Sequence, residues 1–134
     1  MAEEQPKVRI LVVEDDLELQ ELIRGLIERA GYEYIRALTV ADAVAVLRVR
    51  PLPTLVVLDL MLPDISGFEL LRQMRAKPMF DDLPVIILSA LADPKEIKQG
   101  LDLGADRYLT KPYIAHNLLK TVNDVLRTGR RRVE

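Results

Sequence analysis

Cysteine is absent from the 134-residue sequence, and this excludes several kinds of chemistry. Without thiols the chain has no disulfide framework, no thiolate metal site and no cysteine nucleophile. The absence suits a reducing compartment, where disulfides do not persist.

An excess of positive charge and a long apolar segment are also missing. The formal net charge is -2, whereas a nucleic-acid or membrane-surface binder normally carries a basic excess. The apolar run that follows the N-terminal MAEEQPK is too short to cross a bilayer, and we see no signal peptide or anchor. We therefore expect a cytoplasmic protein that binds neither a membrane nor, through this domain, nucleic acid.

The remaining composition is that of an ordinary globular domain. Hydrophobic residues make up 49% and charged residues 30% of the chain, which suits one domain with a real core. We expect the folded domain to span residues 7–128, with an N-terminal tail at 1–6 and a C-terminal tail or linker at 129–134.

Apolar runs rich in β-branched residues recur along the chain and predict strands buried on both faces. The strongest runs are 8–13, 54–59 and 84–90, and weaker candidates are 32–37 and 106–110.

Helical patterns lie between these strands. Leu19, Leu22, Ile23, Leu26 and Ile27 form one apolar stripe on a first helix, which Asp16 caps and Gly31 ends. Thr39 caps a second helix through Leu47, and Ser66 or Gly67 opens a third. Asp93 and Glu96 form a capping-box pattern for a fourth helix. The last helix runs from about Ile114 to Arg127.

This strict alternation predicts an α/β fold: a single-domain, doubly wound (βα)5 arrangement with a five-stranded parallel sheet. The flavodoxin-like strand order 2-1-3-4-5 is the natural solution for five strands. In that order the first and third strands are neighbours, and their carboxyl ends flank a switch point where ligands bind. The fold therefore predicts that Glu14, Asp15 and Asp59 lie together.

Three carboxylates at one edge of a sheet repel one another and raise one another's pKa values unless a cation intervenes. Mg²⁺ suits such an all-oxygen cluster. Lys111, after the fifth strand, and Ser89, at the end of the fourth, arrive at the same edge. One ionised acid near a metal, an ammonium and a hydroxyl can accept a phosphoryl group, and we expect Asp59 to be the acceptor.

The successive motifs ILVVEDD, LVVLDLMLPDISG, VIILSA and GADRYLTKP resemble those of the response-regulator receiver domain of two-component signalling. The resemblance covers nearly the whole chain. It implies that Asp59 is phosphorylated by a histidine kinase or histidine phosphotransfer protein. It also implies that Glu14 and Asp15 hold Mg²⁺, Asp15 directly and Glu14 through water.

The same resemblance assigns further roles. Met61 would offer its backbone carbonyl to the metal, Ser89 matches the switch hydroxyl, and Lys111 matches the family's lysine. Pro112 would follow a cis peptide, and Tyr108 would be the aromatic switch residue.

Phosphorylation is expected to draw Ser89 inward, to let Tyr108 fill the vacated space, and so to shift the surface formed by the fourth helix, fifth strand and fifth helix. That surface carries mixed charges, on Lys95, Lys98, Arg107, Lys120 and Asp124. Such charges suit a homodimer or another partner. Arg107 stands where the winged-helix class of regulators often has an acid, which puts the dimer typical of that class in doubt.

The product of such a domain is a conformation, so it is not a conventional enzyme. It takes a phosphoryl group from phosphohistidine and slowly hydrolyses it. The residues two positions after Asp59 and Ser89 are Met61 and Leu91, and in this family such side chains influence the attacking water. Because neither can hydrogen-bond a water, we expect slow self-dephosphorylation.

Three alternatives to a receiver can be compared with this sequence. A haloacid-dehalogenase-like phosphatase or phosphotransferase also forms an aspartyl phosphate, but it needs a second acid where this chain has Met61. A pseudo-receiver with an interaction role is disfavoured by the complete set of acids, hydroxyl and lysine. A nucleotide-binding module is weaker still, because no Gly-rich loop follows the first strand. His116 is expected to be a helix-surface residue without a role.

Overall fold

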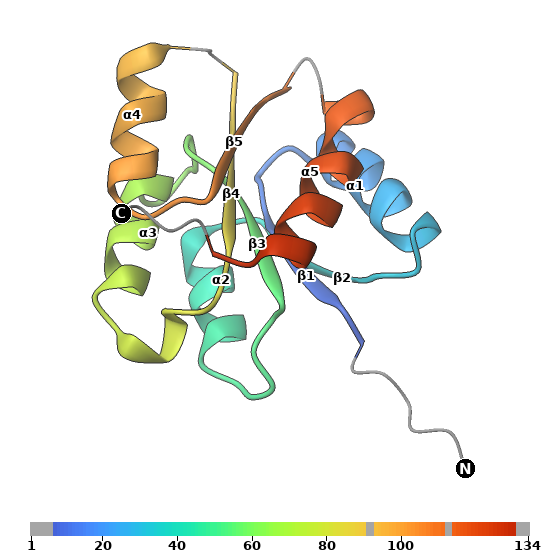
Figure 1. Ribbon diagram of the computed structural model, residues 1–134, viewed down its shortest axis with the longest axis horizontal. Coiled ribbons are helices and arrows are strands. Elements are labelled where there is room, and N and C mark those ends of the chain that lie inside the picture. Colours follow the sequence, from blue (N-terminus) through green and yellow to red (C-terminus); the bar gives the residue numbers. More distant parts are fainter. Residues whose placement is uncertain (1–6, 91–92, 112–113, 131–134) are drawn as a thin grey trace.

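The computed structural model describes residues 7–90, 93–111 and 114–130, and within them strands and helices alternate (Figure 1). The elements are β1 (Arg9–Val13), α1 (Leu17–Arg29), β2 (Glu33–Ala37), α2 (Val40–Leu47), β3 (Leu55–Asp59), α3 (Gly67–Arg75), the 3-10 turn η1 (Pro78–Phe80), β4 (Val85–Ser89), α4 (Pro94–Asp102), β5 (Arg107–Thr110) and α5 (Ile114–Thr128). Every predicted strand and helix is present, and each strand is slightly shorter than predicted.

The strands form one parallel sheet in the order β2-β1-β3-β4-β5, which confirms the predicted doubly wound fold. Val13 lies opposite Leu58, Asp59 opposite Leu88, and Ser89 opposite Thr110. Because the registers match, the residues that follow β1, β3, β4 and β5 emerge at one edge of the sheet.

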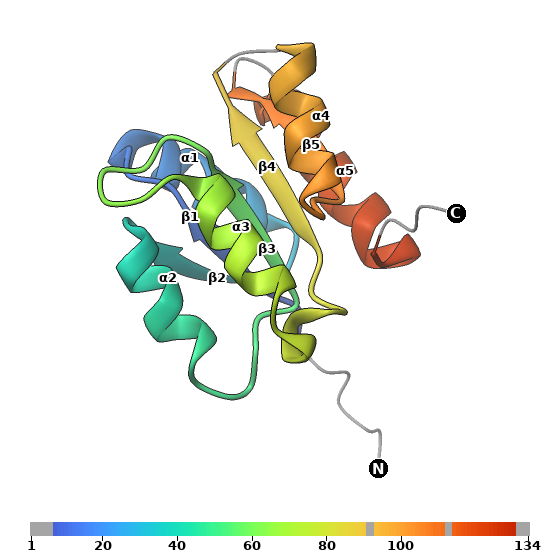
Figure 2. The same ribbon diagram turned by 90° about the vertical axis from the view of Figure 1, so that its left-hand side faces the viewer.

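Both faces of the sheet are covered by helices. One core lies between the sheet and α2, α3 and α4, and the other lies between the sheet and α1 and α5 (Figures 1 and 2). Alternate strand residues serve the two layers: Leu11 and Val13 belong to the first core, and Ile10 and Val12 to the second. This two-sided burial explains why the strands are continuous apolar runs rather than alternating ones.

The predicted helix ends are confirmed. Side chains of Asp16, Thr39, Ser66 and Asp93 accept hydrogen bonds from backbone N–H groups in the first turns of α1, α2, α3 and α4. Gly31 follows α1 with a φ of 86°, a left-handed conformation that favours glycine.

Gly67 sets the distance between α3 and the end of β3. A Cβ at this position would lie 2.2 Å from the backbone oxygen of Asp59. Only glycine therefore allows the first turn of α3 to approach the strand end that carries Asp59.

None of the helices in the described part of the chain has the length and apolarity that a bilayer crossing requires. A cis peptide bond joins Arg50 and Pro51. The cis peptide predicted at Pro112 lies outside the described residues.

Candidate functional site

The three predicted acids meet at the carboxyl edge of the sheet. Glu14 follows β1 directly, Asp15 is next, and Asp59 is the last residue of β3. One carboxylate oxygen from each lies within 4.8 Å of the others. Glu14 and Asp59 are buried, at 0% and 1% exposure, whereas Asp15 is exposed. The topology therefore gathers these side chains as predicted.

Lys111 is the cation of this cluster. Its Nζ lies 2.9 Å from Glu14 Oε1 and 3.0 Å from Asp59 Oδ2. The other oxygen of Asp59, Oδ1, accepts a hydrogen bond of 3.1 Å from the backbone N–H of Met61. One ammonium thus contacts two buried carboxylates, with a third acid beside them.

This imbalance shifts the protonation of the cluster. Burial raises the pKa of Glu14 to about 8; the hydrogen bond and charge of Asp59 act in the same direction, and Lys111 opposes them. Burial lowers the pKa of Lys111, but its contacts with Glu14 and Asp59 outweigh burial and raise the pKa overall. The cluster therefore favours either a retained proton or a further cation.

The donor set also fits a metal ion. Carboxylate oxygens at this spacing are the ligands that hard divalent cations prefer, and such a cation can displace the proton that Glu14 retains. The acidic cluster is thus consistent with metal binding.

Ser89 ends β4 and is 5% exposed. Its Oγ donates a hydrogen bond of 2.7 Å to Glu96 Oε1, and the Tyr108 hydroxyl donates one of 2.9 Å to the same oxygen. Ser89 and Tyr108 therefore share one acceptor on the first turn of α4.

The sequence analysis missed this role of Glu96. The capping pattern correctly identified Asp93, whose Oδ1 accepts from the backbone N–H of Lys95 at 2.9 Å. The Glu96 carboxylate, however, contacts β4 and β5 side chains. The sequence did offer one sign of this contact: Glu96 lies in the first turn of the helix that comes next after Ser89.

Gln20 was also missed, although its signal was visible: it is a polar residue on the inner side of α1. Its side chain is fully buried, and Nε2 donates to the backbone oxygens of Val12 (3.1 Å), Glu14 (2.9 Å) and Ala37 (3.1 Å). The Tyr34 hydroxyl donates to Gln20 Oε1. Gln20 thereby fixes the backbone from which Glu14 projects.

Asp64 lies five residues after Asp59 but outside the acidic cluster. Its carboxylate oxygens accept hydrogen bonds of 3.0 Å from the backbone N–H groups of Val40 and Ala41, at the start of α2. These backbone donors lower the pKa of Asp64. The loop after β3 is therefore fastened to α2.

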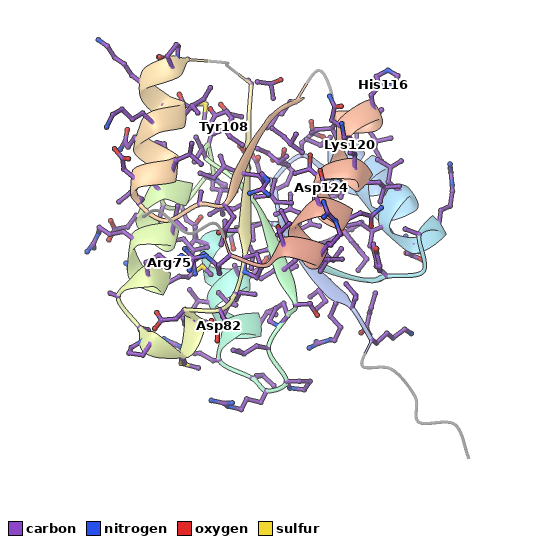
Figure 3. All side chains as sticks on the ribbon, in the orientation of Figure 1. Arg75, Asp82, Tyr108, His116, Lys120 and Asp124 are labelled. Atoms are coloured by element: carbon purple, nitrogen blue, oxygen red, sulfur yellow. The ribbon has the colours of Figure 1, made fainter. Side chains whose placement is uncertain are left out.

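Other predicted residues are placed as follows. The Met61 side chain is 77% exposed, whereas Leu91 lies outside the described residues. His116 is exposed near the start of α5, and Figure 3 shows it on the outer side of that helix.

Some charges on the surface of α4, β5 and α5 have partners within the chain. Lys98 Nζ contacts Asp102 Oδ2 at 2.7 Å along α4, and Arg107 Nη1 donates to the backbone oxygen of Asp106 at 2.7 Å. Asp124 lies 3.5 Å from Arg127 along α5. The homodimer expected through this surface remains a prediction.

Residues 10–123 match the family model described as the response regulator receiver domain. The chain is 40% identical to the phosphate regulon transcriptional regulatory protein PhoB of Pseudomonas aeruginosa, over 88% of this chain and 51% of that protein. It is 39% identical to the DNA-binding dual master transcriptional regulator RpaA of Synechocystis, over 89% of this chain and 49% of that protein. The chain thus spans about half the length of these relatives.

Solved structures show the same likeness. The Francisella response regulator 1452 receiver domain superposes with a TM-score of 0.83 at 30% identity, covering 90% of this chain and 98% of that one. The Thermotoga maritima response regulator DrrB, an OmpR/PhoB homologue, gives 0.80 at 31% identity, covering 91% of this chain and 54% of that one. The fold, the acidic cluster and these matches agree, and the chain belongs to the response-regulator receiver domain family of two-component signalling.

Proposed function

We propose that Asp59 accepts a phosphoryl group from the phosphohistidine of a histidine kinase or histidine phosphotransfer protein. One observation carries this proposal: Asp59 is buried, Lys111 Nζ lies 3.0 Å from its Oδ2, and two further acids lie within 4.8 Å. An ion pair that served stability alone would not need three carboxylates around one ammonium.

In the proposed reaction a carboxylate oxygen of Asp59 attacks phosphorus, the P–N bond to the donor histidine breaks, and an acyl phosphate forms. Lys111 neutralises charge on the phosphoryl oxygens, and Ser89 donates a hydrogen bond to one of them. Mg²⁺, held by Asp15, Asp59 and the Met61 carbonyl, with Glu14 acting through water, would supply further positive charge at the same oxygens.

The output follows from the added charge. Phosphorylation brings about -1.5 to -2 charges and three acceptor oxygens to Asp59. We propose that Ser89 and Tyr108 respond as switch residues and that the surface of α4, β5 and α5 changes. A homodimer or another protein partner would bind this surface, and the domain itself would not contact nucleic acid.

The lifetime of the acyl phosphate is proposed to be minutes or longer. The Met61 side chain offers no hydrogen bond to an attacking water, and the same holds for Leu91 by its residue type. Replacing Met61 with Asn should accelerate dephosphorylation. A half-life of seconds in the unaltered protein would contradict the proposal.

Intact-mass measurement after incubation with Mg²⁺ and acetyl phosphate tests phosphoryl acceptance. The unaltered chain and Asp64→Asn should each gain the mass of one phosphoryl group, whereas Asp59→Asn should not. Asp64 is a matched control because it is an acid in the same loop whose oxygens contact α2.

Two results would overturn the proposal. A gain that persists in Asp59→Asn would place the acceptor elsewhere. No gain in the unaltered chain, with Mg²⁺ shown to bind, would favour the pseudo-receiver.

A further inference from the structure

Side chains from three elements meet at one carboxylate oxygen, Glu96 Oε1. Ser89 at the end of β4 and Tyr108 on β5 each donate a hydrogen bond to it, at 2.7 and 2.9 Å. Figure 3 shows Tyr108 on the side of β5 that faces α4. Burial raises the pKa of Tyr108 to about 12, with Ser89 opposing the rise and Glu96 adding to it, so Tyr108 remains a hydroxyl donor at neutral pH.

The contact matters because the first turn of α4 contributes no buried residue, whereas Leu101 near the far end of the helix packs against the core. Gly100 is the buried residue of this helix, and a Cβ there would lie 2.6 Å from Ile87 Cδ1. Pro94 and Lys95, in the first turn, are exposed. The bonds to Ser89 and Tyr108 therefore fasten the first turn of α4 to the sheet.

Helix capping does not account for the position of Glu96. Asp93 already accepts from the backbone N–H of Lys95, and the Glu96 oxygen instead accepts from Ser89 at the end of β4 and from Tyr108 within β5. The carboxylate thus joins the helix to the hydroxyl of Ser89, the residue after Leu88, which lies opposite Asp59 in the sheet.

A serine hydroxyl carries one hydrogen. Ser89 cannot donate to Glu96 and to a phosphoryl oxygen on Asp59 at the same time, so these two acceptors compete. From this competition we infer that Glu96 is a positioning residue that holds Ser89 and Tyr108 in the unphosphorylated arrangement, and that phosphorylation of Asp59 acts by breaking the Ser89–Glu96 bond. The inference rests on the proposed function.

Breaking this bond has a consequence for α4. Glu96 loses one of two donors, its remaining bond is to Tyr108, and the first turn of the helix is less firmly held. Any change that weakens the Glu96 contact should therefore raise the fraction of molecules ready to bind a phosphoryl group, and the apparent affinity for a phosphoryl mimic rises with that fraction.

The test is an isothermal titration calorimetry experiment in which beryllofluoride is added to the protein in the presence of Mg²⁺. Glu96→Ala should bind about fivefold more tightly than the unaltered chain. Glu96→Gln, which keeps an uncharged acceptor oxygen, should give about a twofold gain. Asp102→Ala is the matched control, because Asp102 is an exposed acid on the same helix that pairs with Lys98; it should bind as the unaltered chain does.

A second measurement separates positioning from general loosening. Without beryllofluoride, the amide of Ile97 should exchange its hydrogen faster in Glu96→Ala than in Asp102→Ala, whereas amides in β1 should be unchanged. Equal or weaker beryllofluoride binding by Glu96→Ala, in a chain whose Asp59 still takes up a phosphoryl group, would overturn the inference alone. Failure of the unaltered chain to bind beryllofluoride or to gain phosphate would overturn the proposed function, and the inference with it.

Discussion

The two ends of the sheet each bury carboxylates beside cations, but with opposite balances of charge. At the carboxyl edge, Glu14 and Asp59 share Lys111, with Asp15 close by. At the other end a single buried acid, Asp106, lies between two arginines, Arg75 and Arg130. Figure 3 shows Arg75 toward the opposite end of the molecule from Tyr108.

The carboxylate of Asp106 accepts hydrogen bonds on both of its oxygens. Asp106 Oδ2 accepts from the backbone N–H of Val85 at 2.9 Å and from Arg75 Nη2 at 3.4 Å, and Oδ1 accepts from Arg130 Nε at 2.8 Å. Asp106 is 1% exposed. Every oxygen of this buried carboxylate therefore has a partner in the chain.

Both arginines use their other N–H groups on backbone oxygens. Arg75 donates to Phe80, Leu83 and Gly104, at 2.7, 2.8 and 3.0 Å. Arg130 donates to Asp81 and Gly104, at 2.7 and 3.1 Å. Burial lowers the pKa of Arg75 to about 10, with the charge of Arg130 adding and Asp106 opposing; Arg75 therefore remains charged at pH 7.

The comparison assigns a structural role to the Asp106 cluster and a binding role to the acidic cluster. The charges of Asp106, Arg75 and Arg130 all have partners within the chain and need no ligand. They hold together η1, the start of β5 and the segment that follows α5. Excess acids around one lysine leave room for a further cation and for a group that the cation neutralises.

Removing Asp106, the acid between the two arginines, should have the largest effect. Asp106→Ala leaves two partly buried arginines without their carboxylate, and we expect a loss of about 3 kcal/mol in the free energy of unfolding. Urea denaturation measures it, with Asp82→Ala, an exposed acid nearby, as the control. A loss as small as that of Asp82→Ala would mean that the cluster is not structural.

Removing an acid from the cluster of Glu14, Asp15 and Asp59 should instead raise the free energy of unfolding. The folded-state pKa of Glu14, about 8, lies above its ordinary value of 4.5. The folded protein thus binds the extra proton, and the resulting stability is present below pH 4.5 and lost as the pH rises through 8.

Glu14→Gln should therefore stabilise the Mg²⁺-free protein at pH 9, by on the order of 2 kcal/mol, and by much less at pH 5. Thermal unfolding across this pH range measures it. A destabilisation at pH 9 would show that Glu14 serves as a structural anion.

Arg130→Ala should have a smaller effect than Asp106→Ala, because Arg75 still pairs with Asp106. We expect a loss of about 1 kcal/mol in urea denaturation. Truncation after Thr128 should give the same loss, and this comparison tests the domain boundary predicted at residue 128. Unchanged stability in both variants would support that boundary and contradict a structural role for Arg130.

Asp64→Ala should have the smallest effect. Asp64 is an acid near Asp59, yet its donors lie in α2, so it should behave like Asp106, whose partners all lie within the chain. Loss of its two hydrogen bonds from the start of α2 should lower the free energy of unfolding less than Arg130→Ala does, and the stabilisation produced by Mg²⁺ should be unchanged. A change in the Mg²⁺ effect would instead place Asp64 in the metal site.

The fold and the acidic cluster were accessible from the sequence for a physical reason. Continuous β-branched runs predict strands buried on both faces, and a parallel sheet places the residues after those strands at one edge. The positions of Glu14 and Asp59 follow from topology alone and do not depend on side-chain rotamers.

The roles of Glu96 and Arg130 depend on side-chain packing that no short pattern encodes. Glu96 fitted a local capping pattern, which hid its contact with Ser89. Arg130 lies 24 residues after Asp106, within a stretch whose composition suggests a solvated tail. Neither partner could be identified from sequence spacing.

The most direct test of the difference between the clusters is thermal unfolding with increasing Mg²⁺, comparing the unaltered chain with Asp59→Asn and Asp106→Asn. A ligand that binds the folded state raises the Tm. We predict a rise for the unaltered chain, an equal rise from a lower starting Tm for Asp106→Asn, and a much smaller rise for Asp59→Asn. Equal rises in all three proteins, or none in the unaltered chain, would contradict a cation site at the carboxyl edge of the sheet.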